Sequence, residues 1–204
     1  MKFARYFLLV FLPVFSSAQS TVHAFFQLSG PEKCWVIGHL FKAKRAFTIT
    51  KETRLTVQQE KSNTALDTFH HGGKIDAFRH TYWMMQLTRG IGEKSARKLG
   101  KAHEKGNYKA FKKGKGEDGV VQDATAVEMD LLNNEQGIAI ALATPTGDDT
   151  ILKQLVITAV TTGKLFILKR DSLGRLCDCN GSAIPESPRS KSEWKLPYCL
   201  IPSY

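Results

Sequence analysis

Apolar residues recur every three or four positions, which is the period of an α-helix, over much of the chain. The pattern appears in five segments, 31–47, 75–89, 93–105, 123–142 and 148–162. Residues 49–68 are polar and only loosely periodic, so they predict either a helix or a loop. Glycine, proline or polar residues interrupt the chain between the segments. The pattern therefore predicts a mainly α fold of about four to five helices.

The pattern changes after the last helical segment. Residues 164–170 alternate between apolar and polar side chains, and a turn ending at Gly174 leads into a second short apolar run. Alternation on both sides of such a turn is typical of a β-hairpin. We expect a single helical domain over 19–204 that carries a small C-terminal β-hairpin.

The first 18 residues have the features of a secretory signal peptide. Lys2 and Arg5 precede an apolar run, and small residues follow it, with Ser16 and Ala18 at the positions that a signal peptidase reads. Cleavage after Ala24 is the alternative. The apolar run is shorter than the roughly 20 residues that cross a bilayer, so we expect no transmembrane segment. The pattern predicts a secreted or periplasmic protein.

Four cysteines remain after such a cleavage: Cys34, Cys177, Cys179 and Cys199. An even number of cysteines in an exported chain favours disulfides, here two. Cys177 and Cys179 are too close to bridge each other easily, so each is expected to pair with Cys34 or Cys199, in either order. Zinc binding is the weaker alternative, because the paired Cys-x-x-Cys knuckles of a zinc site are missing.

The formal net charge is +10, and most of the excess lies in one region. Between Arg89 and Lys115 the chain has ten lysines and arginines against two glutamates. Such a region attracts an anionic polymer or an anionic lipid surface, although an ordinary solvated helix has the same composition. We find no specific nucleic-acid motif. Residues 107–123, rich in glycine and lysine, predict either a lid over a site or a plain surface insertion.

Polar side chains gather on three of the predicted helices. Burying an unpaired polar group costs about 1–3 kcal/mol, so repeated acids, histidines and asparagines indicate either a reactive site or a satisfied network. The candidates for catalysis are His80, His103, Glu104 and Asp130. The candidates for substrate binding are Asp76, Arg79, Asn133 and Asn134.

Three interpretations of these residues remain open. In the first, His80, His103 and Asp130 hold a divalent metal that lowers the pKa of a bound water. In the second, no metal takes part, and Glu104 or Asp130 acts as general acid or base. In the third, the residues form a structural network in which Arg79 pairs with an acid of the 123–142 helix.

The same residues carry a resemblance to a known family. The motifs D-A-F-R-H-x-Y-W from Asp76, A-H-E from Ala102 and M-D-L-x-N-N from Met129 resemble an uncharacterised bacterial domain family. That family occurs in exported proteins and at the C-terminal ends of large surface or toxin proteins. The resemblance implies a mostly helical domain whose motif positions are the eight candidates, and it implies no reaction. Some relatives carry a histidine where this chain has Leu132.

The functional expectation follows from these features together. We expect a hydrolase that acts on a cell-envelope or other extracellular anionic polymer or lipid. The alternative is a non-catalytic secreted module that binds an anionic surface and uses the polar motif as a structural network.

Overall fold

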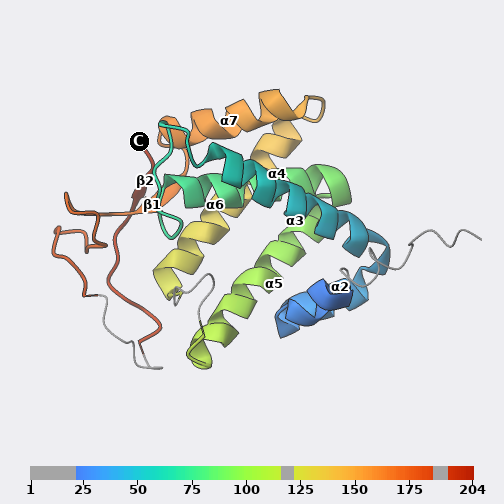
Figure 1. Ribbon diagram of the computed structural model, residues 1–204, viewed down its shortest axis with the longest axis horizontal. Helices are drawn as coiled ribbons and strands as arrows, with labels where there is room; N and C mark the ends of the chain where they lie inside the picture. The colour runs from blue at the N-terminus through green and yellow to red at the C-terminus, as the bar shows by residue number, and fades with distance from the viewer. Residues whose placement is uncertain (1–21, 116–121, 186–192) are drawn as a thin grey trace, which may run out of the picture.

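The computed structural model describes residues 22–115, 122–185 and 193–204, and most of them are helical. A short helix over 22–27 is followed by six longer ones, which are α2 (Gly30–Gly38), α3 (Leu40–Glu60), α4 (Lys74–Ile91), α5 (Glu93–Lys112), α6 (Ala124–Ala143) and α7 (Asp149–Thr161). Two strands, β1 (Phe166–Leu168) and β2 (Leu200–Pro202), complete the described part (Figure 1). The mainly α prediction is confirmed, and the expected number of helices is too low.

Helix α4 is the centre of the molecule. It packs against α3, α5, α6 and α7, as Figure 1 shows. Its apolar residues cover most of its circumference, and Phe78, Met84, Met85 and Leu87 are almost completely buried. A helix that is apolar on most sides is buried on most sides, so α4 can carry polar side chains only where neighbouring helices satisfy them.

The first predicted helix is two helices in the structure. Helix α2 ends at Gly38, and His39 leaves the helical conformation with φ −137° and ψ 41°. The His39 ring stacks on Trp35 with the ring centroids 4.6 Å apart. Helix α3 then continues through the polar residues after Phe47 as far as Glu60, which settles the open choice between helix and loop there in favour of helix up to that residue.

Helix α5 is longer than its sequence pattern predicts. Phe111 is 2 % exposed and packs against Trp194 of the C-terminal segment, with ring centroids 4.9 Å apart. This contact extends the apolar face of α5 into the segment predicted to be a lid or a surface insertion. The rest of that segment includes residues 116–121, which lie outside the described residues.

The small sheet forms at the C-terminal end, as predicted, but its strands are distant in sequence. Strand β1 pairs with β2 in antiparallel register, with Ile167 opposite Ile201. The expected hairpin partner of β1 contributes isolated bridges, one of them between Arg170 and Leu176 across the Gly174 turn.

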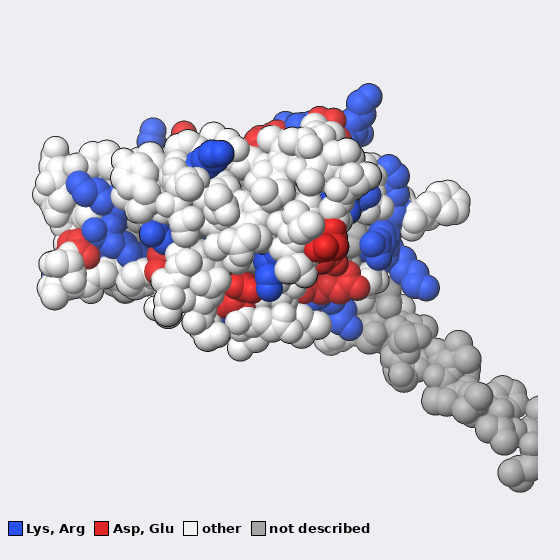
Figure 2. All heavy atoms as spheres, turned by 90° about the horizontal axis from the view of Figure 1, so that it is seen from above, with Lys and Arg blue, Asp and Glu red and all other residues white. Residues whose placement is uncertain are grey.

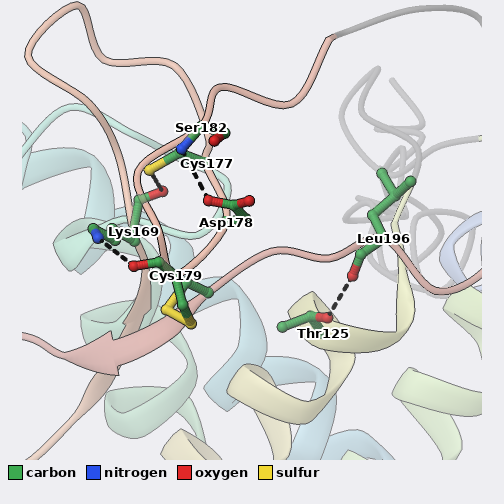
Figure 3. Close-up of a disulfide and its surroundings, with 8 residues drawn as sticks. Thr125, Lys169, Cys177, Asp178, Cys179, Ser182 and Leu196 are labelled. Carbon is green, nitrogen blue, oxygen red and sulfur yellow. Dashed lines mark hydrogen bonds between the residues drawn. A yellow bond between two sulfur atoms is a disulfide. The ribbon is translucent and has the colours of Figure 1, made fainter.

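One disulfide is present among the described residues, between Cys179 and Cys199 (Figure 3). This is one of the two pairings expected for Cys199. The second predicted disulfide is wrong, because Cys34 is exposed and Cys177 is buried, and both are free thiols. The Cys177 thiol lies 3.5 Å from the carbonyl oxygen of Lys169, away from α2, which carries Cys34.

The predicted leader, residues 1–18, lies outside the described residues. Among the helices that are described, none is long and apolar enough to span a bilayer.

Candidate functional site

Helices α4 and α6 bring two carboxylates to one imidazole. Asp76 and His80 are one turn apart on α4, so their side chains share a face, and both are 2 % exposed. Asp130 of α6 is 1 % exposed. The Nε2 atom of His80 lies 3.3 Å from Oδ1 of Asp130 and 3.6 Å from Oδ1 of Asp76. One ring nitrogen therefore faces two carboxylate oxygens.

Arg79 contacts the same group of atoms from the solvent side. Its Nη2 donates to Oδ1 of Asp76 at 2.6 Å and lies 3.1 Å from Nε2 of His80. A guanidinium only donates, so Nε2 must accept from Arg79, whereas a contact with the Asp130 carboxylate requires Nε2 to donate. A single ring nitrogen cannot do both. The Arg79 side chain is 26 % exposed, which makes it the cluster member with access to water.

The electrostatics keep Asp76 ionised. Burial raises the pKa of this carboxyl, but the Arg79 charge, the His80 ring and the Gly72 N–H together lower it by more, so the pKa lies below its usual value. The Gly72 N–H donates to Oδ2 at 2.7 Å. Gly72 has φ +72°, and a Cβ there would overlap the Leu168 side chain, so the turn that delivers this N–H requires glycine.

A close contact between backbones aligns the two helices. A Cβ on Gly137 of α6 would collide with the Thr81 carbonyl oxygen of α4. The Thr81 hydroxyl donates to the Asn133 carbonyl oxygen at 3.1 Å, one turn before Gly137. These contacts fix the position of α6 along α4 and so place Asp130 opposite His80.

The two neighbouring asparagines of α6 have different environments. The Asn133 amide donates to the Phe166 carbonyl and accepts from the Phe166 N–H, both at 2.9 Å, so it ties α6 to β1. Asn134 is 3 % exposed, and neither atom of its amide has a hydrogen-bond partner among the described residues. Its Nδ2 lies beside Gly100 of α5, where an added Cβ would be 3.3 Å away. Of the two, Asn134 is the one whose amide the fold leaves available.

His103 lies next to the cluster and has a carboxylate of its own. Its Nδ1 is 3.0 Å from Oε1 of Glu32, and its ring centroid is 6.3 Å from that of His80. Burial raises the pKa of Glu32, but the His103 contact and the Ser29 hydrogen bonds lower it by more, so the pKa lies below its usual value. The Trp83 and His103 rings also form a T-shaped pair, with centroids 5.4 Å apart. His103 is thus held in place between α2 and α4.

Sequence reasoning missed Glu32. The signal was present, because Ser29 and Glu32 form the S-x-x-E pattern of a capping box at the start of α2, and the structure has both of its hydrogen bonds. The capping role by itself explains a glutamate at this position, so nothing in the sequence indicates a second contact with His103 across the fold.

Glu104 points away from Glu32, the residue that contacts His103. It is 3 % exposed, and its Oε2 accepts from Nδ2 of Asn107 at 3.0 Å within α5. Adjacent residues on a helix point about 100° apart, so His103 and Glu104 reach different surroundings.

Three of these side chains have the geometry for a cation. Within the described ranges, one group of histidine, cysteine or acidic side chains has its ligand atoms all within 4.8 Å of one another, and it consists of Asp76, His80 and Asp130. Two carboxylate oxygens and one imidazole nitrogen suit a divalent metal such as Zn²⁺ or Mn²⁺. His103, the third ligand predicted from the sequence, is outside this group. The predicted substrate residue Asp76 is inside it.

Comparison with curated proteins and with solved structures finds no match. A family model described as Domain of unknown function (DUF6973) matches residues 33–164, a range that contains all eight predicted site residues. Because this match covers well over half of the chain, the protein belongs to the DUF6973 family.

Proposed function

We propose that this protein is an exported metal-dependent hydrolase that acts on an anionic polymer or lipid, with Asp76, His80 and Asp130 as ligands of a divalent cation. The observation that carries the proposal is the convergence of three buried ligand atoms within 4.8 Å. Two carboxylates and one imidazole nitrogen gathered in a buried place form a donor set that suits a divalent cation.

The charge balance of the cluster favours a cation. With both carboxylates ionised, Arg79 neutralises one of them and the buried cluster keeps one negative charge. A proton on His80 would balance it, but that proton would then oppose the Arg79 contact at 3.1 Å. A divalent ion would instead be held by the Nε2 lone pair and both carboxylates. Arg79, being partly exposed, has room to turn toward solvent.

The surrounding residues have separate roles in this proposal. A divalent cation held by these residues would supply a water of lowered pKa as the nucleophile near neutral pH. Arg79 at the solvent edge binds the anionic group of the substrate. Glu32 orients His103 through Nδ1, so Nε2 is the atom that exchanges a proton with the substrate. Asn134 offers a buried amide beside Gly100 of α5, and Asn133 holds β1.

The outer face of α5 favours an anionic substrate. It carries a row of exposed lysines at helical spacing, Lys94, Lys98, Lys101, Lys105, Lys109 and Lys112. The opposite face of the same helix carries His103. A row of like charges raises the local concentration of anions along this face of the molecule. The predicted leader and the Cys179–Cys199 disulfide support an extracellular or periplasmic location.

Metal binding is the direct test. The chelator-treated protein is titrated with Mn²⁺ and Zn²⁺ by calorimetry, and cleavage of a chromogenic phosphodiester is followed in parallel. We expect one site per chain, lost in His80→Gln and Asp130→Asn. His103→Gln is the matched variant, because it should bind the metal normally and lose most of the hydrolysis. Binding without defined stoichiometry, or binding that survives both ligand substitutions, would overturn the proposal.

A non-catalytic role has one observation in its favour, the near-complete burial of the acids and His80. In that case the cluster only joins α4 to α6, and the protein is a module that binds an anionic surface. The two roles differ in the stability of metal-free Asp130→Asn, which changes one acid of the cluster. A functional site predicts a change within about 1 kcal/mol, and a structural network predicts a loss of several.

A further inference from the structure

The corner between α2 and α3 exposes large apolar side chains. Ile37 is 65 % exposed, Leu40 67 % and Phe41 fully exposed, and they lie within five consecutive positions around His39. Both helices bury other residues, such as Trp35 and Ala46, so the corner residues are not needed for the core. A contiguous group of exposed apolar side chains usually marks a surface that meets a partner.

The same corner is positively charged. From Glu32 to Glu52 the chain contains no other acid, and it contains Lys33, Lys42, Lys44, Arg45 and Lys51. Lys44 and Arg45 are exposed beside Phe41. The Lys42 amino group donates to the Ile91 carbonyl and the Ser95 hydroxyl, so its charge is held at the same end of the molecule. Figure 2 shows Lys and Arg side chains gathered at the right-hand end, where α2 meets α3 in Figure 1.

Exposed apolar side chains next to positive charges indicate which kind of partner binds the α2–α3 corner. In a symmetric contact between two copies, the patch would face itself and bring its cations together. An anionic lipid surface satisfies both features, because apolar side chains enter the boundary between headgroups and acyl chains while lysines and arginines meet the phosphates. The charge pattern therefore favours lipid over a second copy.

The structure points to a lipid-docking surface at the α2–α3 corner, with Leu40 and Phe41 inserted and with Lys44 and Arg45 on the headgroups of an anionic bilayer. This inference is independent of the proposed hydrolysis, since it uses none of the cluster residues. Glu32, which contacts His103, lies on the same helix as Ile37, about 8 Å along the helix axis.

Vesicle sedimentation tests the inference. Vesicles of equal parts phosphatidylglycerol and phosphatidylcholine are compared with phosphatidylcholine alone, and every protein carries the same N-terminus, so that any contribution from the leader is constant. We expect binding to the anionic vesicles that falls steeply with salt. The double variant Leu40→Ser, Phe41→Ser should bind at least about tenfold more weakly. Lys44→Gln and Arg45→Gln should each weaken binding about fivefold.

The matched control is Leu173→Ser, which removes an apolar side chain that is 75 % exposed in a turn outside the α2–α3 corner. It should leave vesicle binding unchanged. The inference fails if Leu40→Ser, Phe41→Ser binds as the parent does, or if neutral vesicles bind equally well. It also fails if the corner substitutions abolish a dimer, seen by analytical ultracentrifugation, without changing vesicle binding.

Discussion

Arg79 and His80, adjacent in sequence on α4, place a guanidinium nitrogen 3.1 Å from an imidazole nitrogen that also faces two carboxylates. The guanidinium therefore lies beside the atoms that would hold a cation. Arg79 and the cation compete for the same negative charge, and the partly exposed side chain of Arg79 is the one able to leave.

Replacing Arg79 with Gln should therefore tighten metal binding and weaken hydrolysis. Removal of one positive charge next to the ligands should lower the Kd for Mn²⁺ by roughly tenfold. The KM for an anionic substrate should rise by a similar factor, because the anion loses its partner at the solvent edge. Calorimetry and initial rates measure the two effects.

Arg97→Gln is the matched control for this change. Arg97 pairs with Glu93 and Glu135 on the α5–α6 surface, away from the cluster. It should alter neither metal affinity nor KM. Weaker metal binding in Arg79→Gln would show that the guanidinium supports the cluster and does not compete with the metal.

Acidification should destabilise the protein through Asp76 and Glu32. The pKa of each carboxyl is lowered in the folded state, so each contributes stability that is present above its unfolded pKa and is lost as the pH falls through its folded pKa. The loss therefore begins near the usual values of 3.8 and 4.5 and continues below them. Urea unfolding from pH 7 to pH 3 should show this fall in the free energy of unfolding.

Asp76→Asn should flatten that pH dependence, because the amide does not titrate. Glu52→Gln removes an exposed carboxyl instead and should leave the slope as it is in the parent. Equal slopes in the parent and Asp76→Asn would contradict a lowered pKa at Asp76.

Gly137→Ala should destabilise the protein by roughly 1–3 kcal/mol, because its methyl group meets the Thr81 carbonyl of α4 and forces the helices apart. Gly38→Ala is the control, since a Cβ there has no atom within 4 Å. It should be neutral or slightly stabilising. Chemical denaturation measures both changes. If Gly137→Ala were as stable as the parent, the close approach of α4 and α6 would be wrong.

Loss of the Cys179–Cys199 disulfide should cost about 3 kcal/mol, the value expected for a closed loop of about 20 residues. Cys199→Ser measures it by urea unfolding, and Cys34→Ser, which removes an exposed free thiol, should change nothing. Thiol titration of the unfolded, unreduced parent should find the two thiols of Cys34 and Cys177. Finding none would restore a second disulfide.

The helical part of the fold could be predicted because its periodicity reports burial directly. Segment 75–89 corresponds to α4 and segment 148–162 to α7, each within a few residues. The corner at His39 could not be predicted, because Leu40 and Phe41 continue the apolar pattern although they are exposed. An apolar side chain tends to be buried, but only the folded structure shows whether a particular one is buried.

The candidate site follows the same logic. The i, i+4 spacing of Asp76 and His80 predicts a shared face, and their meeting with Asp130 required the packing of α6 on α4. Pairing across long stretches of sequence is not encoded in local pattern, so the contact of Glu32 with His103 and the pairing of β1 with β2 were missed.

Asn134 and Asn133 provide the sharpest separation of function from structure. The Asn134 amide is buried and has no hydrogen-bond partner among the described residues, so replacing it with leucine should raise the free energy of unfolding by roughly 1–2 kcal/mol. The same change at Asn133 removes two hydrogen bonds to Phe166 and should lower it by about 2 kcal/mol. If Asn134 serves the site, Asn134→Leu should be more stable than the parent and less active. Urea unfolding combined with the phosphodiester assay decides this, and equal losses of stability in both variants would mean that the Asn134 amide is structural.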